Sequence, residues 1–187
     1  MNDTTKTIAG GPTPLHRPAF TTKGYTLETA ADIVAIQQLL ARYSHLLDSD
    51  TSDPKQIALL FAPDGEVLPA YEGDAVYKGR EAIEKWFANY LFHSRKGSKL
   101  RRHLISSIRI EVDGDKGWAF SMLDAQGIQL ANNKLAFFIG SYEDDLVRNG
   151  DRWFFQRRRV SLDYSWQAPE YTLCRNGKQI WDGAVEK

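Results

Sequence analysis

The chain of 187 residues has little of several features that would point to a specialised class of protein. Its single cysteine, Cys174, cannot form an internal disulfide, which favours a reducing, cytoplasmic environment. The 24 basic residues balance the 24 acidic ones, so no net field favours nucleic acid or a membrane surface as a partner. No apolar run approaches the roughly 20 residues that span a bilayer. With 42% hydrophobic residues, the composition is that of a globular domain with a real core.

The motifs of several common active sites are missing as well. There is no Gly-rich phosphate loop, GxSxG elbow, HExxH pair or CxxC pair. The histidines lack close ligand spacing, so we expect neither a metal nor another cofactor. The basic segment HSRKGSKLRR, residues 93–102, has no interleaved aromatic residues, which is typical of an exposed connection rather than a nucleic-acid site.

Composition along the chain predicts one domain with an extension at each end. Residues 1–24 are expected to form a flexible arm, because the first 20 contain three prolines, two glycines and no apolar signal region. Residues 25–166 carry the regular patterns of the domain. Residues 167–187 form a tail with a possible small hairpin around Asn176 and Gly177.

Three helices are expected first. In the first, Thr29 and Asp32 resemble a capping box, and an apolar stripe follows with Tyr43 near its middle, pointing inward. Asp48 lies off that stripe and comes inward only if the helix ends or tightens near Leu47, as the following SDTSDP suggests. His45 lies off the stripe and is expected to be solvated. The second helix opens at Asp53-Pro54, and the third spans the amphipathic segment GREAIEKWFANYLF, residues 79–92.

The pattern then changes to that of strands. A strand with an irregular hairpin is expected at residues 66–79, between the second and third helices, and four long strands follow at 103–112, 118–130, 134–148 and 152–166. Asp113-Gly114 and Asn149-Gly150 between them are strong hairpin signals. The expected fold is therefore α+β, with the helices packed on one face of a curved sheet.

Alternation along the strands places polar groups beside apolar ones. Asp124 shares a face with Trp118 and Phe120, and a carboxylate there needs a partner if it is buried. Arg158 shares a face with Phe154, which is equally compatible with a pocket arginine and with an aliphatic stem whose head reaches solvent. The direction of His103 stays open, since the purely apolar face of its strand is the opposite one and a bulge could reverse it. His93, at a helix end, is expected to be exposed.

At this point the chain resembles the SnoaL-like family of the nuclear transport factor 2-like superfamily. The resemblance covers roughly residues 27–166 and is carried by four ordered segments: LFAPDGEV, YKGREAIEKWF, RHLISSIRIEVDGDKGWA and GSYEDDLVRNGDRWFFQRRRVSLDY. It implies a cone-shaped α+β barrel, in which three N-terminal helices pack on a strongly curved, mixed but mainly antiparallel sheet around an apolar pocket.

The resemblance also implies site residues. Family lyases such as scytalone dehydratase, bile-acid 7α-dehydratase and hexachlorocyclohexane dehydrochlorinase rely on a His–Asp pair. Tyr43 and Asp48 match a family tyrosine five residues before its aspartate, and His103 stands where the family histidine opens the first long strand. Asp124 corresponds to an acidic residue on the next strand. Arg158, five residues after Trp153, corresponds to a pocket arginine that binds substrate.

These correspondences imply a cofactor-independent lyase of the dehydratase type acting on a hydrophobic cyclic or polycyclic substrate. The expected apolar pocket lining is Trp86, Phe120, Phe138 and Phe154. The same superfamily also contains isomerases, cyclases and non-catalytic assembly subunits such as the β subunits of ring-hydroxylating dioxygenases, and these remain alternatives. A homo-oligomer, dimer or trimer, is the expected assembly.

Overall fold

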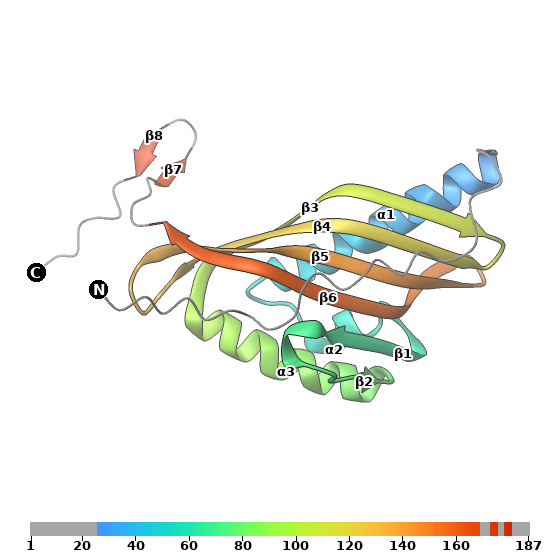
Figure 1. Ribbon diagram of the computed structural model, residues 1–187, viewed down its shortest axis with the longest axis horizontal. Coiled ribbons are helices and arrows are strands. Elements are labelled where there is room, and N and C mark those ends of the chain that lie inside the picture. Colours follow the sequence, from blue (N-terminus) through green and yellow to red (C-terminus); the bar gives the residue numbers. More distant parts are fainter. Residues whose placement is uncertain (1–25, 169–172, 176–177, 181–187) are drawn as a thin grey trace, which may run out of the picture.

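The computed structural model describes residues 26–168, 173–175 and 178–180 (Figure 1). The arm expected at residues 1–24 lies outside the described residues. In the tail, β7 (Leu173–Arg175) and β8 (Lys178–Ile180) pair antiparallel, as the expected small hairpin requires, while the turn residues between them are not described.

The first helix, α1 (Leu27–Asp48), begins earlier than the sequence suggests. Its capping box joins Thr26 and Thr29, so the predicted box of Thr29 and Asp32 is wrong. Asp32 instead lies one turn inside the helix, where its carboxylate accepts a hydrogen bond of 2.8 Å from the indole Nε1 of Trp153. A buried carboxylate needs such a donor, and this one ties α1 to the last long strand.

Two further helices precede the main sheet. The short α2 (Pro54–Ala58) has Asp53 as N-cap and Pro54 in its first turn, as predicted. The long α3 (Arg80–Gly97) runs through much of the basic segment expected to be an exposed connection, and the strand β3 (Ser98–Asp113) takes up the remainder. That prediction is wrong because the segment continues the helix and then enters a strand, in which Arg101 is buried. A short 3-10 turn, η1 (Ala70–Glu72), lies between the strands β1 (Phe61–Pro69) and β2 (Tyr77–Lys78).

Six strands form one mixed sheet in the order β2-β1-β6-β5-β4-β3. They are β1 (Phe61–Pro69), β2 (Tyr77–Lys78), β3 (Ser98–Asp113), β4 (Lys116–Gln129), β5 (Lys134–Asn149) and β6 (Arg152–Ala168). β1 pairs parallel with β6 and every other neighbouring pair is antiparallel. The sheet is open, and Figure 1 shows the four long strands as one curved layer with α3 running below it. The predicted α+β class, with three helices on a mixed, mainly antiparallel sheet, is confirmed.

Bulges decide which side chains of the long strands face the helices. In β3, Leu100 and Ser107 have φ of 53° and 49°, and the pairing register with β4 shifts at both places. An extra residue reverses the alternation of faces. His103 and Val112 are nine positions apart, so in a regular strand they would face opposite sides. Because of the bulge at Ser107, both face inward. Leu104, expected on the same face as Val112, is 49% exposed on the outer side.

A third bulge changes the faces of β6. The register with β5 passes from Arg157 directly to Phe155, which leaves Gln156 as the extra residue. Phe155 and Arg158 consequently both lie in the core, fully buried. Phe154 lies on the other face, beneath the guanidinium of Arg80. The predicted shared face of Phe154 and Arg158 is therefore wrong, because the alternation does not continue through Gln156.

The core fills the space between the helices and the inner face of the sheet. Its buried aromatic members include Tyr43, Phe61, Phe87, Tyr142 and Phe155. None of the helices in the described part of the chain is long and apolar enough to cross a membrane.

Candidate functional site

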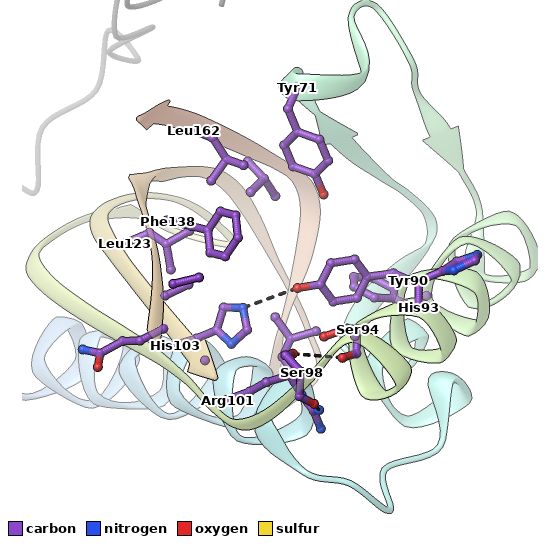
Figure 2. Close-up of a pocket in the computed structure, with 18 of the residues that line it drawn as sticks. Tyr71, Tyr90, His93, Ser94, Ser98, Arg101, His103, Leu123, Phe138 and Leu162 are labelled. Carbon is purple, nitrogen blue, oxygen red and sulfur yellow. Dashed lines mark hydrogen bonds between the residues drawn. The ribbon is translucent and has the colours of Figure 1, made fainter. Parts of the chain in front are cut away.

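A cavity of about 480 Å³ opens between α3 and the inner face of the sheet (Figure 2). Its walls come from α1, η1, α3 and strands β3 to β6, and most of the lining is apolar or aromatic. One group of polar side chains lies along α3 and the start of β3, where Tyr90, Ser94, Arg101 and His103 lie together. A concave, mainly apolar cavity with a few convergent polar groups is the form that small-molecule sites take.

Asp48 and His103 meet at this polar side of the cavity. Asp48 Oδ1 lies 2.6 Å from His103 Nδ1, and Oδ2 accepts a hydrogen bond of 3.0 Å from the His103 backbone N–H. Asp48 is the last residue of α1, so its carboxylate leaves the helix where the regular wheel would have turned it away. The imidazole is nearly buried, with 9% of the side chain exposed. The sequence-predicted contact between Asp48 and His103 is thus present.

This contact determines the role of the other ring nitrogen. A carboxylate at Nδ1 requires that nitrogen to carry the proton, so in the neutral imidazole Nε2 is the acceptor. Nε2 points toward the Tyr90 hydroxyl, 3.5 Å away (Figure 2). Burial raises the pKa of Tyr90 to about 12, partly offset by the positive charge of Arg101. Tyr90 therefore remains a protonated donor at neutral pH.

The turn after α1 is held from α3 by Arg95. One guanidinium nitrogen, Nη2, donates to the backbone oxygens of Ser49 and Ser52 at 3.1 and 2.7 Å and to the Ser52 hydroxyl at 2.7 Å. A second link joins Asp50 to the buried Arg101, which also donates to the Ser98 carbonyl at 2.7 Å. These contacts connect the end of α1 to the start of β3, and so they fix the position of Asp48 relative to His103.

Tyr43 lines the cavity with a ring that is 2% exposed, as the helical wheel predicted. Burial raises the pKa of its hydroxyl well above the ordinary value, although Arg158 opposes the shift. The Arg158 guanidinium lies 4.0 Å from the centre of this ring and 4.2 and 4.1 Å from those of Tyr142 and Phe155. Arg158 thus lies behind the tyrosines that form part of the cavity wall.

Arg158 has its partner within the core. Its Nε and Nη2 atoms each donate to a separate oxygen of Asp144 at 2.8 Å, and neither side chain is exposed. Burial alone would lower the pKa of Arg158, but the carboxylate outweighs it and the pKa lies above its usual value. Burial also raises the pKa of Asp144, and Arg158 opposes that shift. The expectation that Arg158 contacts substrate disagrees with this placement, since the fully buried side chain does not reach the cavity.

The other predicted residues divide between the two faces of the sheet. Trp86 and Phe138 line the cavity. Phe120 and Phe154 do not line it. Phe120 stacks on Trp118, and the sequence neighbours Ala119 and Phe155 are the residues that face inward at these two positions. Their predicted place in the lining is wrong because alternation gives two faces without saying which one the helices cover.

Asp124 also faces away from the cavity. In the sheet it lies between Leu104 and Ile139, while its sequence neighbours Leu123 and Ala125 form part of the cavity wall. Its Oδ1 atom is buried and, within the part of the chain that the structure describes, has no hydrogen-bond partner. Asp124, which the resemblance implied as a site residue, therefore does not line the cavity.

Several cavity residues were not singled out from the sequence. Tyr90 follows Trp86 by one helical turn, and that spacing alone could have placed its hydroxyl beside the same cavity. Arg101 carries no such signal, because its burial results from the bulge at Leu100 and from Asp50 far away in the sequence. Among the described residues, no group of histidine, cysteine, aspartate and glutamate side chains is arranged to hold a metal ion.

Comparison with known proteins agrees with the architecture. The model of the SnoaL-like domain family matches residues 28–159. A candidate scytalone dehydratase from Novosphingobium aromaticivorans has 24% identity and a TM-score of 0.63, over 80% of this chain and 98% of its own. A Mycobacterium tuberculosis protein of unknown function has 27% identity and a TM-score of 0.62, over 75% of this chain and 76% of its own.

A further solved structure is that of hexachlorocyclohexane dehydrochlorinase LinA-type3 from Novosphingobium barchaimii. It has 20% identity and a TM-score of 0.66, over 80% of this chain and 98% of its own. At such identities the likeness to the two Novosphingobium proteins concerns the fold. No curated protein matches the chain.

Proposed function

The chain belongs to the SnoaL-like family, and we propose that it is a cofactor-independent lyase of the dehydratase type. The substrate would be a hydrophobic cyclic or polycyclic compound, held in the cavity of about 480 Å³. The observation that carries the proposal is the contact of 2.6 Å between Asp48 Oδ1 and His103 Nδ1, with Nε2 left to accept a proton beside the cavity.

His103 acts as the general base. Its Nε2 removes a proton from the carbon next to a carbonyl of the substrate, and the C–H electrons move into an enolate. The imidazolium that forms is stabilised by Asp48, which also holds the ring in the required tautomer. The backbone N–H of His103 donates to the second oxygen of the Asp48 carboxylate. This hydrogen bond offsets the unfavourable interaction of the carboxylate with the C-terminal end of the α1 dipole.

Two protonated tyrosines assist the charged oxygen. Tyr43 and Tyr90 both line the cavity, and burial raises the pKa of each hydroxyl, so both can donate hydrogen bonds to an enolate oxygen. When the enolate collapses, the hydroxyl on the adjacent carbon leaves with the proton returned by the His103 imidazolium. The net change is loss of one water and formation of a carbon–carbon double bond.

The direct test substitutes His103→Ala and Asp48→Asn and follows enone formation from a panel of cyclic β-hydroxy ketones. A positioned general base contributes on the order of 10²- to 10⁴-fold, so each variant should lose at least about 10²-fold in kcat. His45→Ala and Asp64→Asn serve as matched controls, because both side chains are exposed and neither lines the cavity. Unchanged turnover in folded His103→Ala protein would remove the dyad from the mechanism.

An isomerase or cyclase could use the same base. In that case His103 returns the proton to another carbon, and no water leaves. Product analysis in deuterated water separates the two reactions, since isomerisation places the label at a new carbon whereas dehydration changes the product mass by one water.

A further inference from the structure

Glu72 holds a defined position on the cavity wall, at the end of η1. The indole Nε1 of Trp86 donates to both of its carboxylate oxygens, at 3.2 and 3.3 Å, and the hydroxyl of Tyr77 donates to Oε2 at 2.9 Å. An exposed glutamate ordinarily samples many rotamers, and ordering it costs entropy. Two aromatic donors from different elements instead fix this carboxylate at the edge of the cavity.

The proposed acid–base chemistry makes no use of Glu72. Its carboxylate offers about four lone-pair positions, so two donors leave it able to accept a further hydrogen bond. Because the group lines the cavity, the additional donor can belong to a bound molecule.

Stacked aromatic rings connect Glu72 with the dyad. Tyr77 stacks at a tilt on Trp86 with ring centroids 5.6 Å apart, and Trp86 stacks on Tyr90 at 5.6 Å and 17°. Tyr77 and Trp86 donate to Glu72 at one end of this ladder, and the Tyr90 hydroxyl faces His103 at the other. Since Trp86 and Tyr90 both line the cavity, a flat ring system can lie along them with one end near each polar group.

The two ends also differ in charge. At the dyad end Arg101 is paired with Asp50, and the Tyr90 hydroxyl is a neutral donor beside His103, whereas the other end has the anionic carboxylate of Glu72. A ligand with an oxygen acceptor at one end and a donor at the other matches this arrangement in only one orientation.

We infer that Glu72 binds a hydrogen-bond-donating substituent, a hydroxyl or ammonium group, on the part of the substrate remote from the carbon that His103 deprotonates. The substrate class is thereby narrowed to ring compounds that carry a carbonyl at one end and a donor at the other. The inference rests on the proposed function, because it assigns the second end of the same site.

The test measures binding without turnover, in the full chain carrying His103→Ala. The two probes are 2-naphthol, which has a donor, and 2-methoxynaphthalene, which has the same ring system and only an acceptor. Titration calorimetry should give 2-naphthol the lower Kd, by on the order of 10-fold, as expected for a hydrogen bond to a charged acceptor. The absence of the imidazole removes one other acceptor that a naphthol could use, and the Glu72→Gln variant distinguishes Glu72 from the acceptors that remain in the wall, such as Ser94 and Gln126.

Glu72→Gln should reduce this preference to less than about 3-fold, because Gln keeps the size but loses the charge and one acceptor oxygen. Glu81→Gln is the matched control: it removes the same charge from an exposed position of α3 outside the cavity wall and should leave the preference unchanged. Tyr77→Phe keeps the carboxylate but removes one of the donors that orient it, and should give an intermediate preference.

Equal Kd values for the two probes in the His103→Ala chain that retains Glu72 would overturn the inference. An undiminished preference for 2-naphthol after Glu72→Gln is added would overturn it as well. Its failure is distinct from failure of the proposed function. A dyad without catalytic role would appear as unchanged turnover in His103→Ala, while this binding preference is measured in protein that already lacks His103.

Discussion

The ion pair of Asp144 and Arg158 predicts a large and asymmetric effect of single substitutions. Both side chains are completely buried, and two hydrogen bonds of 2.8 Å join them. Removing one partner of a buried pair typically costs about 3–5 kcal/mol, because the other charge stays buried without compensation. Asp144→Asn would leave the Arg158 guanidinium with only the aromatic contacts that it already makes in the unsubstituted chain, so these contacts do not compensate the lost carboxylate. We therefore expect Asp144→Asn to lose about 3 kcal/mol of the free energy of unfolding.

Urea unfolding followed by tryptophan fluorescence measures this loss. The neighbouring Asp145→Asn is a matched control, since Asp145 pairs with Arg157 at the surface, where the two side chains are 42% and 46% exposed. An exposed pair contributes about 0–1 kcal/mol, so the control should change the free energy of unfolding by less than about 1 kcal/mol.

The double variant Asp144→Asn/Arg158→Met distinguishes the cost of an unpaired buried charge from the cost of lost packing. Methionine removes the unpaired charge and fills a similar volume, so the double variant should be more stable than Asp144→Asn alone by at least about 1 kcal/mol. If Asp144→Asn unfolds at the same urea concentration as the control, the pair is not an essential part of the core.

Two further predictions concern the turn after α1 and the buried tyrosines. Arg95→Gln should lower kcat on the order of 10-fold with little change in KM, because a displaced Asp48 impairs the base and not the apolar binding surface. Arg95→Lys should recover part of the lost kcat, and Lys96→Gln on the same helix should leave kcat unchanged. An equal loss of kcat in both Arg95 variants would contradict a positioning role. Burial raises the pKa of Tyr43, Tyr90 and Tyr142, that of Tyr90 to about 12, so their contribution to stability is complete below pH 10 and is lost as the pH rises through these folded-state values. Absorbance at 295 nm should accordingly show a group of phenols in the folded protein that ionise only above pH 11 or on unfolding, and ionisation of all eight tyrosines near pH 10 in the folded state would refute the burial argument.

The parts of the fold that local sequence determines were predictable. Asp53-Pro54 starts α2, and Asp113-Gly114 and Asn149-Gly150 lie at the turns between the long strands, where both glycines have positive φ. Each of these signals acts through the conformational preference of one or two residues, and no distant contact is needed to interpret it. The inward direction of Tyr43 was equally accessible, because a helical stripe extends over several turns.

Several predictions that depended on long-range geometry failed. The resemblance implied Asp124 as a site residue, and Phe120 and Phe154 were expected in the apolar lining, yet none of the three lines the cavity. The burial of Arg101 depends on Asp50, which lies 51 positions away in the sequence. No periodicity within a strand contains that information, since the choice of covered face is made by the packing of whole elements.

The proposed dyad itself depends on departures from regular structure. Ile110 and Val112 pack in the core at the far end of β3, so an unbroken strand would turn Leu104 inward and His103 out to solvent. The bulge at Ser107 reverses this, at the cost of a non-glycine residue with φ of 49°. Asp48 likewise reaches His103 only because α1 ends at that residue. The contact therefore requires two local features, the end of α1 at Asp48 and the bulge at Ser107, and a longer helix or an unbroken strand would separate the two side chains.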